Sequence, residues 1–423
     1  MNILKRTLYI LRAVPRFLLL SAIVSSSQSF AQAPIRIAFI DPQSGTFAAT
    51  GESGYLQLQF AADFIYNDKG GVLGGRKIEV IALDNKGSAA DSQQQLRRAI
   101  SEGIQFVVSG NGSAVASALS TAIERHNRRN PDQRVLFLNY AAVDPILTGA
   151  DCSFWHFRFD AHSDMKMEVM TSHIAANPNI HKVYIIGQDY SFGKAVGDAA
   201  ISMLAQKRPD IEIVGNELHP IGQVKDFTPY VTKIVSSGAD AIITGNWGGD
   251  MVALGRSIID AGLDVPIYTF YAAYDGITAT LGESGKNRIR LVHNDYANPV
   301  TSDTRMAYTK AFKAKYPHKD VTQPRLATLL QMLVQAMEET GGTDPFQLAT
   351  AMEDMRVVNM TGEEVWMRAE DHQAFQPLYI SVHTDENVVF DADNSGFGLV
   401  TEFSVPTADT ITESSCQMDR PQQ

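Results

Sequence analysis

The chain has 423 residues, 44% of them hydrophobic, which is enough for two or three compact domains with sizeable cores. Its 47 acidic residues outnumber its 36 basic ones, and the net charge at pH 7 is −11. An acidic chain without a basic patch argues against nucleic acid and anionic membranes as partners, and it leaves small ligands open.

The first 31 residues have the pattern of a secretory signal peptide. Basic residues precede the apolar stretch FLLLSAIV (17–24), and small residues at Ser29 and Ala31 match the usual cleavage pattern. The alternative is an uncleaved anchor helix, but this apolar core is short against the ~20 residues that span a bilayer. We therefore expect residues 1–31 to be removed, and the mature chain to be exported without stable membrane insertion.

The mature chain begins with alternating predicted strands and helices. IRIAFID (35–41) is an apolar run typical of a strand buried on both faces. We expect the polar stretch PQSGTFAATGESG (42–54) to be a turn, followed by a helix that starts at Tyr55. The next predicted elements are a strand at 78–83, a helix at 92–103, a strand ending in the turn Gly110–Gly112, a helix through 118–130 and a strand at 135–140.

The same alternation restarts at residue 181 and runs to residue 270. Two successive β–α runs of similar length predict two lobes of one α/β architecture with parallel sheets. After residue 290 the pattern changes to helices at 304–316, 324–339 and 345–355, and then to an antiparallel hairpin within 375–393. These elements form either a third domain or segments that return to complete the two lobes.

Signatures of catalysis are weak. GNGSAV has two glycines of the dinucleotide fingerprint, but Val115 stands in place of the third. Ser113 opens a helix after a strand without the G-x-S-x-G pattern of a nucleophile, so a plain helix N-cap explains it as well. No spacing of histidines and cysteines matches a metal site. We therefore predict a binding protein, not an enzyme, without a cofactor or metal.

The turn at Gly110–Gly112 points to a binding role. Backbone N–H groups at a helix N-terminus favour an anion such as a phosphate or a carboxylate. Phe192, Trp247 and Tyr271 each follow an apolar run, at the carboxyl end of a predicted parallel strand. Ligands of open α/β sheets bind at that edge, so these rings are candidates to flank an organic group.

Only two cysteines are present, Cys152 and Cys416. In an exported protein an even count favours a disulfide, and two buried free thiols are the alternative. A bridge between these cysteines ties the C-terminal tail back to the middle of the chain.

Three stretches resemble a known family: IRIAFIDPQSGTFAATGESG (35–54), IYNDKGGVLGGRKIEVIALDN (65–85) and NYAAVDPILT (139–148). They are similar to the branched-chain amino-acid-binding family of periplasmic solute receptors for ABC importers, and the resemblance runs from about Ile35 to about Phe390. CSFWHFRFDAHSDMKM (152–167) also resembles a subgroup linked to aromatic acids.

The resemblance implies a type I periplasmic binding protein: two Rossmann-like lobes, three hinge crossovers, and a ligand clamped between the lobes. The expected division is a signal peptide (1–31), lobe 1 (32–158 plus 296–362), lobe 2 (159–295 plus 363–405) and a tail (406–423). The expected crossovers lie near 157–161, 292–298 and 361–366. This division assigns the elements after residue 290 to the two lobes.

The resemblance also implies binding residues. The carboxylate-binding serine falls on Ser113, beside the amide of Ala114, and the carbonyl that receives an ammonium falls on Ala141. The remaining positions are Thr50 on the first lobe and the framing rings Phe192 and Trp247.

Two positions depart from the family. Its threonine at the ammonium and carboxylate is Val143 here, and its acidic partner of the ammonium is Tyr271. A buried ammonium without that partner costs several kcal/mol, unless Asp275 replaces it.

These departures lead to a hypothesis about the ligand. We expect a hydrophobic or aromatic carboxylate without an α-ammonium, received by a monomer and delivered to an ABC permease and ATPase complex. The alternatives are a branched-chain amino-acid receptor of the same kind and a sensor that presents its closed form to a signalling partner.

Overall fold

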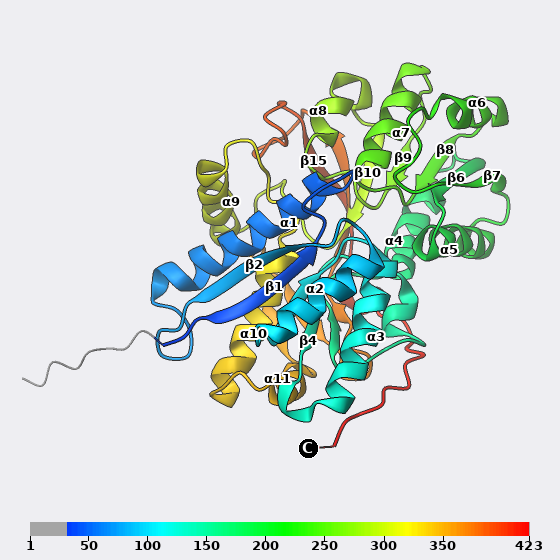
Figure 1. Ribbon diagram of the computed structural model, residues 1–423. Coiled ribbons are helices and arrows are strands. Elements are labelled where there is room, and N and C mark those ends of the chain that lie inside the picture. Colours follow the sequence, from blue (N-terminus) through cyan, green and yellow to red (C-terminus); the bar gives the residue numbers. More distant parts are fainter. Residues whose placement is uncertain (1–31, 423) are drawn as a thin grey trace, which may run out of the picture. The chain divides into compact units, whose positions relative to one another are not determined.

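The computed structural model describes residues 32–422, so the expected signal peptide lies outside the described residues. Two sheets dominate the fold (Figure 1). The first is parallel, and its strands in spatial order are β2 (Ile78–Asp84), β1 (Ile35–Asp41), β3 (Phe106–Ser109), β4 (Leu136–Asn139) and β5 (His156–Arg158). The predicted first strand, 35–41, is therefore confirmed.

The second sheet has seven strands. In spatial order they are β15 (Gly398–Val405), β14 (Leu378–Thr384), β10 (Ile289–His293), β9 (Ile267–Thr269), β8 (Ala241–Thr244), β6 (Lys182–Gln188) and β7 (Glu212–His219). Strands β6 to β10 are parallel, and β14 and β15 add an antiparallel edge. The predicted C-terminal hairpin is present, but its second strand lies beyond 393, because residues 385–397 form the connection. A small antiparallel sheet contains β11 (Arg356–Val358), β12 (Glu364–Met367) and β13 (Ala374–Phe375).

Helices flank both sheets. The longer ones are α1 (Ala48–Ala61), α2 (Ala89–Ser101), α3 (Ser113–Arg129), α4 (Ser163–Ala175), α5 (Ser191–Lys207), α6 (Thr228–Ser237), α7 (Gly249–Asp260), α9 (Asp303–Lys315), α10 (Arg325–Thr340) and α11 (Pro345–Met352), with the one-turn α8 at Ile277–Leu281. Helices α2 and α3 pack together, as do α1 and α10. Figure 1 shows β1 and β2 running between α1 and the pair α2 and α3.

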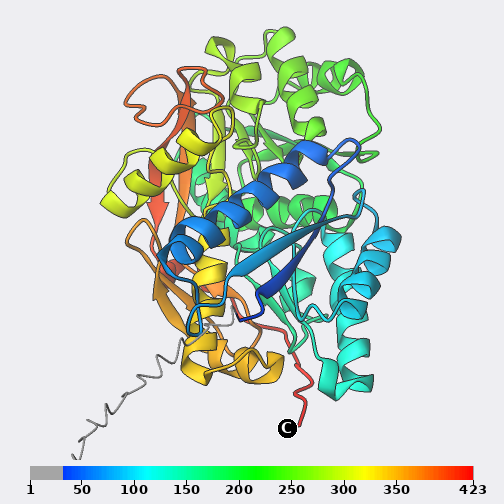
Figure 2. The ribbon, with the colours of Figure 1, turned by 60° about the vertical axis from the view of Figure 1, so that its left-hand side comes forward.

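Each large sheet has its own hydrophobic core. The first core contains β1 and β3 together with Phe312 of α9, Leu330 of α10 and Leu348 of α11. The second contains β6, β8 and β10 together with Ile380 of β14. The elements after residue 290 therefore complete two cores and do not form a third domain. Figure 2 shows the returning α9 and α10 beside α1.

The third passage between the cores, expected near 361–366, involves the small sheet. Val365 and Met367 still belong to the first core, whereas Phe375 and Leu378 belong to the second. Trp366 of β12 packs against the second core, so the side chains of β12 and β13 alternate between the two cores.

Helix α1 begins seven residues before the predicted start at Tyr55. A Cβ atom on Gly51 would lie 1.7 Å from the carbonyl oxygen of Pro42, and one on Gly54 would lie 2.6 Å from the hydroxyl of Tyr140. These glycines permit close packing of a helix and do not mark a turn, which is why the prediction of a polar turn over 48–54 was wrong.

The C-terminal tail after β15 returns to the first sheet. Cys416 forms a disulfide with Cys152, six positions before β5 ends. The His162 ring and the Thr412 hydroxyl are 3.0 Å apart, and Arg420 pairs with Glu353. Between residues 32 and 422, no helix combines the length and apolarity needed to cross a bilayer.

Candidate functional site

The candidate site is built on the glycine turn between β3 and α3. A Cβ atom on Gly110 would lie 2.8 Å from the amide nitrogen of Ala141, so only glycine fits there. Gly112 has φ = 103°, a left-handed conformation that glycine adopts without strain. The turn therefore brings the N-terminus of α3 close to the end of β4.

An anion does occupy the back of this turn, and it comes from the chain itself. The Asp41 carboxylate accepts hydrogen bonds from the Gly110 amide (3.2 Å), the Asn111 amide (3.1 Å) and the Tyr140 hydroxyl (2.7 Å). The Ser109 hydroxyl donates a further bond of 3.0 Å. Burial raises the pKa of Asp41 to about 6, although these hydrogen bonds oppose the rise. The amides of Gly110 and Asn111, which the sequence pattern assigned to a ligand anion, thus donate to the Asp41 carboxylate instead.

The hydroxyl of Ser113 remains available on the front of the turn. Its oxygen accepts a hydrogen bond from the Asp144 amide at 3.3 Å, and the side chain is 3% exposed. A hydroxyl that accepts one bond still has its own proton to donate. Ser113 can therefore donate to a carboxylate at the N-terminus of α3.

Aromatic residues on the second sheet face this turn. The Tyr271 hydroxyl donates to the carbonyl of Ala141 at 3.2 Å. The Trp247 indole donates to the Tyr190 hydroxyl at 2.8 Å. The Phe47 ring, which precedes α1, stacks on Trp247 with centroids 4.2 Å apart. Residues of the two cores are thus in direct contact across the site.

The cavity enclosed between these walls has a volume of about 10 Å³, room for about one water molecule. It is lined by Gly110, Asn111, Gly112, Ser113, Ala141, Ala142, Val143, Tyr190, Phe192, Trp247, Tyr271 and Tyr274. We call it the Ser113 cavity. Burial raises the pKa of Tyr274 to about 12 and that of Tyr271 well above its usual value, so both rings stay neutral. No lining side chain is charged at neutral pH.

Six of the predicted binding residues meet at this cavity: Ser113, Ala141, Val143, Phe192, Trp247 and Tyr271. Ala114 is exposed on the first turn of α3. Thr50 lies on α1 beside Gly248: a Cβ atom added to Gly248 would be 3.7 Å from the Thr50 hydroxyl. Neither residue lines the cavity.

Asp275 does not face the Ser113 cavity. It pairs with Lys319 at 3.2 Å and lies near Asp320 and Asp393, with carboxylate oxygens within 4.8 Å of one another. Lys313 pairs with Asp320 at 2.6 Å. Two lysines thus compensate this acidic cluster, which gives no support for a metal ion at that position.

Sequence reasoning missed Tyr190 and Tyr274 in the cavity wall and Phe47 behind it. Tyr190 and Tyr274 follow β6 and β9, so the same strand-end argument that selected Phe192 and Tyr271 also applies to them. No pattern in the sequence indicated that Phe47 lies near the ligand site, because it is part of the stretch predicted as a polar turn.

Known proteins are similar to this chain over most of its length. The family model for periplasmic binding proteins matches residues 34–386. The Leu/Ile/Val-binding protein homolog 4 of Brucella abortus (strain 2308) is 28% identical, covering 92% of this chain and 93% of the relative.

Solved structures of periplasmic solute-binding proteins are also similar to this chain over most of its length. The leucine-, isoleucine-, valine-, threonine- and alanine-binding protein of Brucella ovis, in its closed conformation, is 27% identical, with a TM-score of 0.80 over 92% of this chain and 100% of that chain. A solute-binding protein of an ABC transporter from R. palustris, in complex with benzoate, is 19% identical, with a TM-score of 0.75 over 91% and 99%; it shows likeness of fold. The chain therefore belongs to the periplasmic binding protein family and has the type I α/β fold expected from its sequence.

Proposed function

We propose that this protein is an extracytoplasmic receptor for a small hydrophobic or aromatic carboxylate that lacks an α-ammonium, and that it delivers this ligand to an ABC importer. One observation carries the proposal: the Tyr271 hydroxyl donates to the Ala141 carbonyl. A ligand ammonium would have to share that carbonyl with the Tyr271 hydroxyl, which is neutral and does not compensate the ammonium charge.

The charge of the cavity wall supports the same conclusion. A buried ammonium without an anionic partner is unfavourable by several kcal/mol. No carboxylate lines the Ser113 cavity, and Asp275 is held by Lys319 outside it. A carboxylate is better provided for, since the Ser113 hydroxyl and the positive end of α3 face it. The Lys166 ammonium, 5.3 Å from the centroid of the Tyr271 ring, adds a positive charge behind the wall.

Binding requires movement, because the Ser113 cavity holds about one water molecule. We propose that a lobe of residues 32–158 plus 296–362 separates from a lobe of residues 159–295 plus about 363–405 by hinge motion. The contact between Phe47 and Trp247 is then broken in the open form and restored around the ligand. We propose two further contacts with the ligand. They are made by Thr50, on the helix α1 that follows Phe47, and by the backbone amide of Ala114.

The wider setting follows from the family. We propose a periplasmic monomer, exported by residues 1–31, that meets a permease and ATPase complex and does not transform its ligand. The acidic net charge of −11 gives no support for nucleic acid as a partner. A second candidate is a branched-chain amino-acid receptor, which the names of the 28% and 27% identical relatives favour.

Thermal unfolding of refolded, ligand-free protein tests the proposal. Benzoate and leucine are titrated separately, and a ligand at 100 times its Kd stabilises by about 2.7 kcal/mol. Stabilisation by benzoate without leucine supports the carboxylate receptor. Stabilisation by leucine alone contradicts it and supports the amino-acid receptor.

A further inference from the structure

A larger cavity lies on the other side of Tyr271 and Tyr274 from the Ser113 cavity, since both tyrosines line both spaces. Its volume is about 90 Å³, room for several water molecules. Three segments enclose most of it: 270–274 after β9, 291–297 at the end of β10, and 320–325 before α10. We call it the Gln323 cavity.

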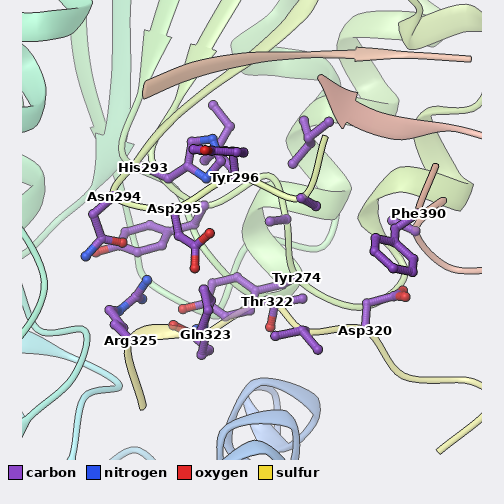
Figure 3. A pocket seen from close by; sticks show the side chains of 18 of the residues that line it. Tyr274, His293, Asn294, Asp295, Tyr296, Asp320, Thr322, Gln323, Arg325 and Phe390 are labelled. Atoms are coloured by element: carbon purple, nitrogen blue, oxygen red, sulfur yellow. The ribbon is translucent and has the colours of Figure 1, made fainter. Parts of the chain in front are cut away.

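Several buried polar atoms in this wall lack a partner. Arg305 Nε and Thr309 Oγ1 are two of them. The other three are the acceptors Asn294 Oδ1, Asp295 Oδ1 and Gln323 Oε1, on residues that are 2%, 8% and 2% exposed. Figure 3 shows these side chains gathered with Arg325 at one end of the hollow, away from Phe390. A buried acceptor without a donor is unfavourable by about 1–3 kcal/mol, and here three of them line one space.

Next to these acceptors, positively charged side chains outnumber negatively charged ones. Lys166 and Arg325 both contact the same oxygen of Asp160, at 2.9 and 3.3 Å. Burial lowers the pKa of Lys166 to about 8, which leaves it mostly charged at pH 7. Two cations therefore share one carboxylate, and the local excess is positive.

The other charged residues of the wall are paired. Arg305 faces Asp295 at 3.4 Å, with its Nε atom unpartnered. At the far end Asp320 pairs with Lys313 at 2.6 Å, and Asp391 lies 3.7 Å from the same lysine. The excess positive charge thus lies at the end nearest Tyr271, over whose ring Lys166 is placed.

We propose that the Gln323 cavity is a second compartment of the ligand site and receives the hydroxyl-bearing end of a hydroxylated carboxylate. Hydroxyl groups supply the donors that Asn294, Asp295 and Gln323 lack. An ammonium would also donate, but the excess positive charge of Lys166 and Arg325 disfavours it.

The two compartments join when the Tyr274 ring turns, because it lines both spaces, and Tyr271 keeps its hydrogen bond to the Ala141 carbonyl. The ligand carboxylate then lies at Ser113, and its hydroxyl end lies at Gln323. This inference rests on the proposed function, since it assumes a carboxylate ligand in the Ser113 cavity.

Calorimetric titration with two ligands of similar shape tests the inference. 4-Hydroxybenzoate carries a donor at the position where 4-methylbenzoate carries an apolar group of similar size. We expect the wild-type protein to prefer 4-hydroxybenzoate at least tenfold, because unpaired acceptors reject an analogue that lacks the hydroxyl. In Gln323→Met and in Asn294→Leu the preference should fall below about threefold, with 4-methylbenzoate affinity little changed. Gln335→Met, on the outer side of α10, is the matched control and should keep the full preference.

The outcomes separate the two proposals. Equal affinity of the wild-type protein for both benzoates overturns the inference and leaves the carboxylate receptor intact. A preference that survives in Gln323→Met and Asn294→Leu also overturns it. Binding of leucine with neither benzoate overturns the proposed function and the second compartment together.

Discussion

Replacing Ser113 with alanine tests the centre of the site. Ser113 is 3% exposed, its oxygen accepts the Asp144 amide at 3.3 Å, and its proton is free to donate to a ligand. A hydrogen bond to a charged group contributes about 1.5–3 kcal/mol. At 1.4 kcal/mol for each factor of ten, Ser113→Ala should raise the Kd for 4-hydroxybenzoate about tenfold to a hundredfold.

The same substitution removes the acceptor of the Asp144 amide, which should lower the free energy of unfolding by about 1 kcal/mol. Affinity is therefore measured by isothermal calorimetry on folded protein and stability by urea unfolding, so that loss of binding and loss of stability are read separately. Ser120→Ala is the control, because Ser120 lies on the same helix and is also buried. Unchanged affinity of a folded Ser113→Ala variant refutes the assignment of Ser113 to the carboxylate.

Three further predictions concern specificity, packing and pH. Tyr271→Glu restores an acid beside the Ala141 carbonyl, so leucine should gain at least tenfold over benzoate in calorimetric titrations; no gain contradicts the charge argument. Gly110→Ala places a Cβ 2.8 Å from a backbone nitrogen and should lower the free energy of unfolding in urea by about 2 kcal/mol, whereas Gly342→Ala, with no atom within 4 Å, should change it by less than about 0.5. Burial lowers the pKa of His156 from 6.5 to about 3, so the unfolded chain takes up this proton first and the stability from the neutral ring is lost as the pH falls below 6.5. Between pH 6.5 and 4.5 this loss is about 2 kcal/mol, and His156→Gln should reduce the slope of urea-unfolding free energy against pH; an unchanged slope excludes His156 as its source.

Much of the fold was predictable because buried parallel strands are short apolar runs. IRIAFID forms β1 over the predicted residues, and the apolar run before Gly110 forms β3. Helix α1 was not predictable to the same extent, since Gly51 and Gly54 read as turn residues. Gly51 allows α1 to approach Pro42, and Gly54 allows it to approach Tyr140. Hydrophobic periodicity within the helix does not reveal these contacts, because both partners lie outside the helix.

The site was predictable where it depends on the carboxyl ends of strands. Phe192, Trp247 and Tyr271 follow strands of one sheet and meet Ser113 at one cavity. The role of Asp41 was not predictable, because the sequence does not reveal that a carboxylate 69 residues before Gly110 occupies its amide. The turn amides that were predicted to bind a ligand anion thus bind Asp41. The Ser113 hydroxyl remains as the donor for a ligand carboxylate.

The larger cavity shows why the ligand could not be read from motifs. Its acceptors come from Asn294 and Asp295 after β10 and from Gln323 before α10, two segments that the sequence presents as connections. They converge because β10 belongs to the second core while α10 belongs to the first, so the chain between them passes from one core to the other. A site at such a passage changes shape whenever the cores move relative to each other. Recognition of a hydroxyl by Asn294, Asp295 and Gln323 would then couple the chemistry of the ligand directly to closure, since only a ligand that satisfies these acceptors stabilises the closed arrangement.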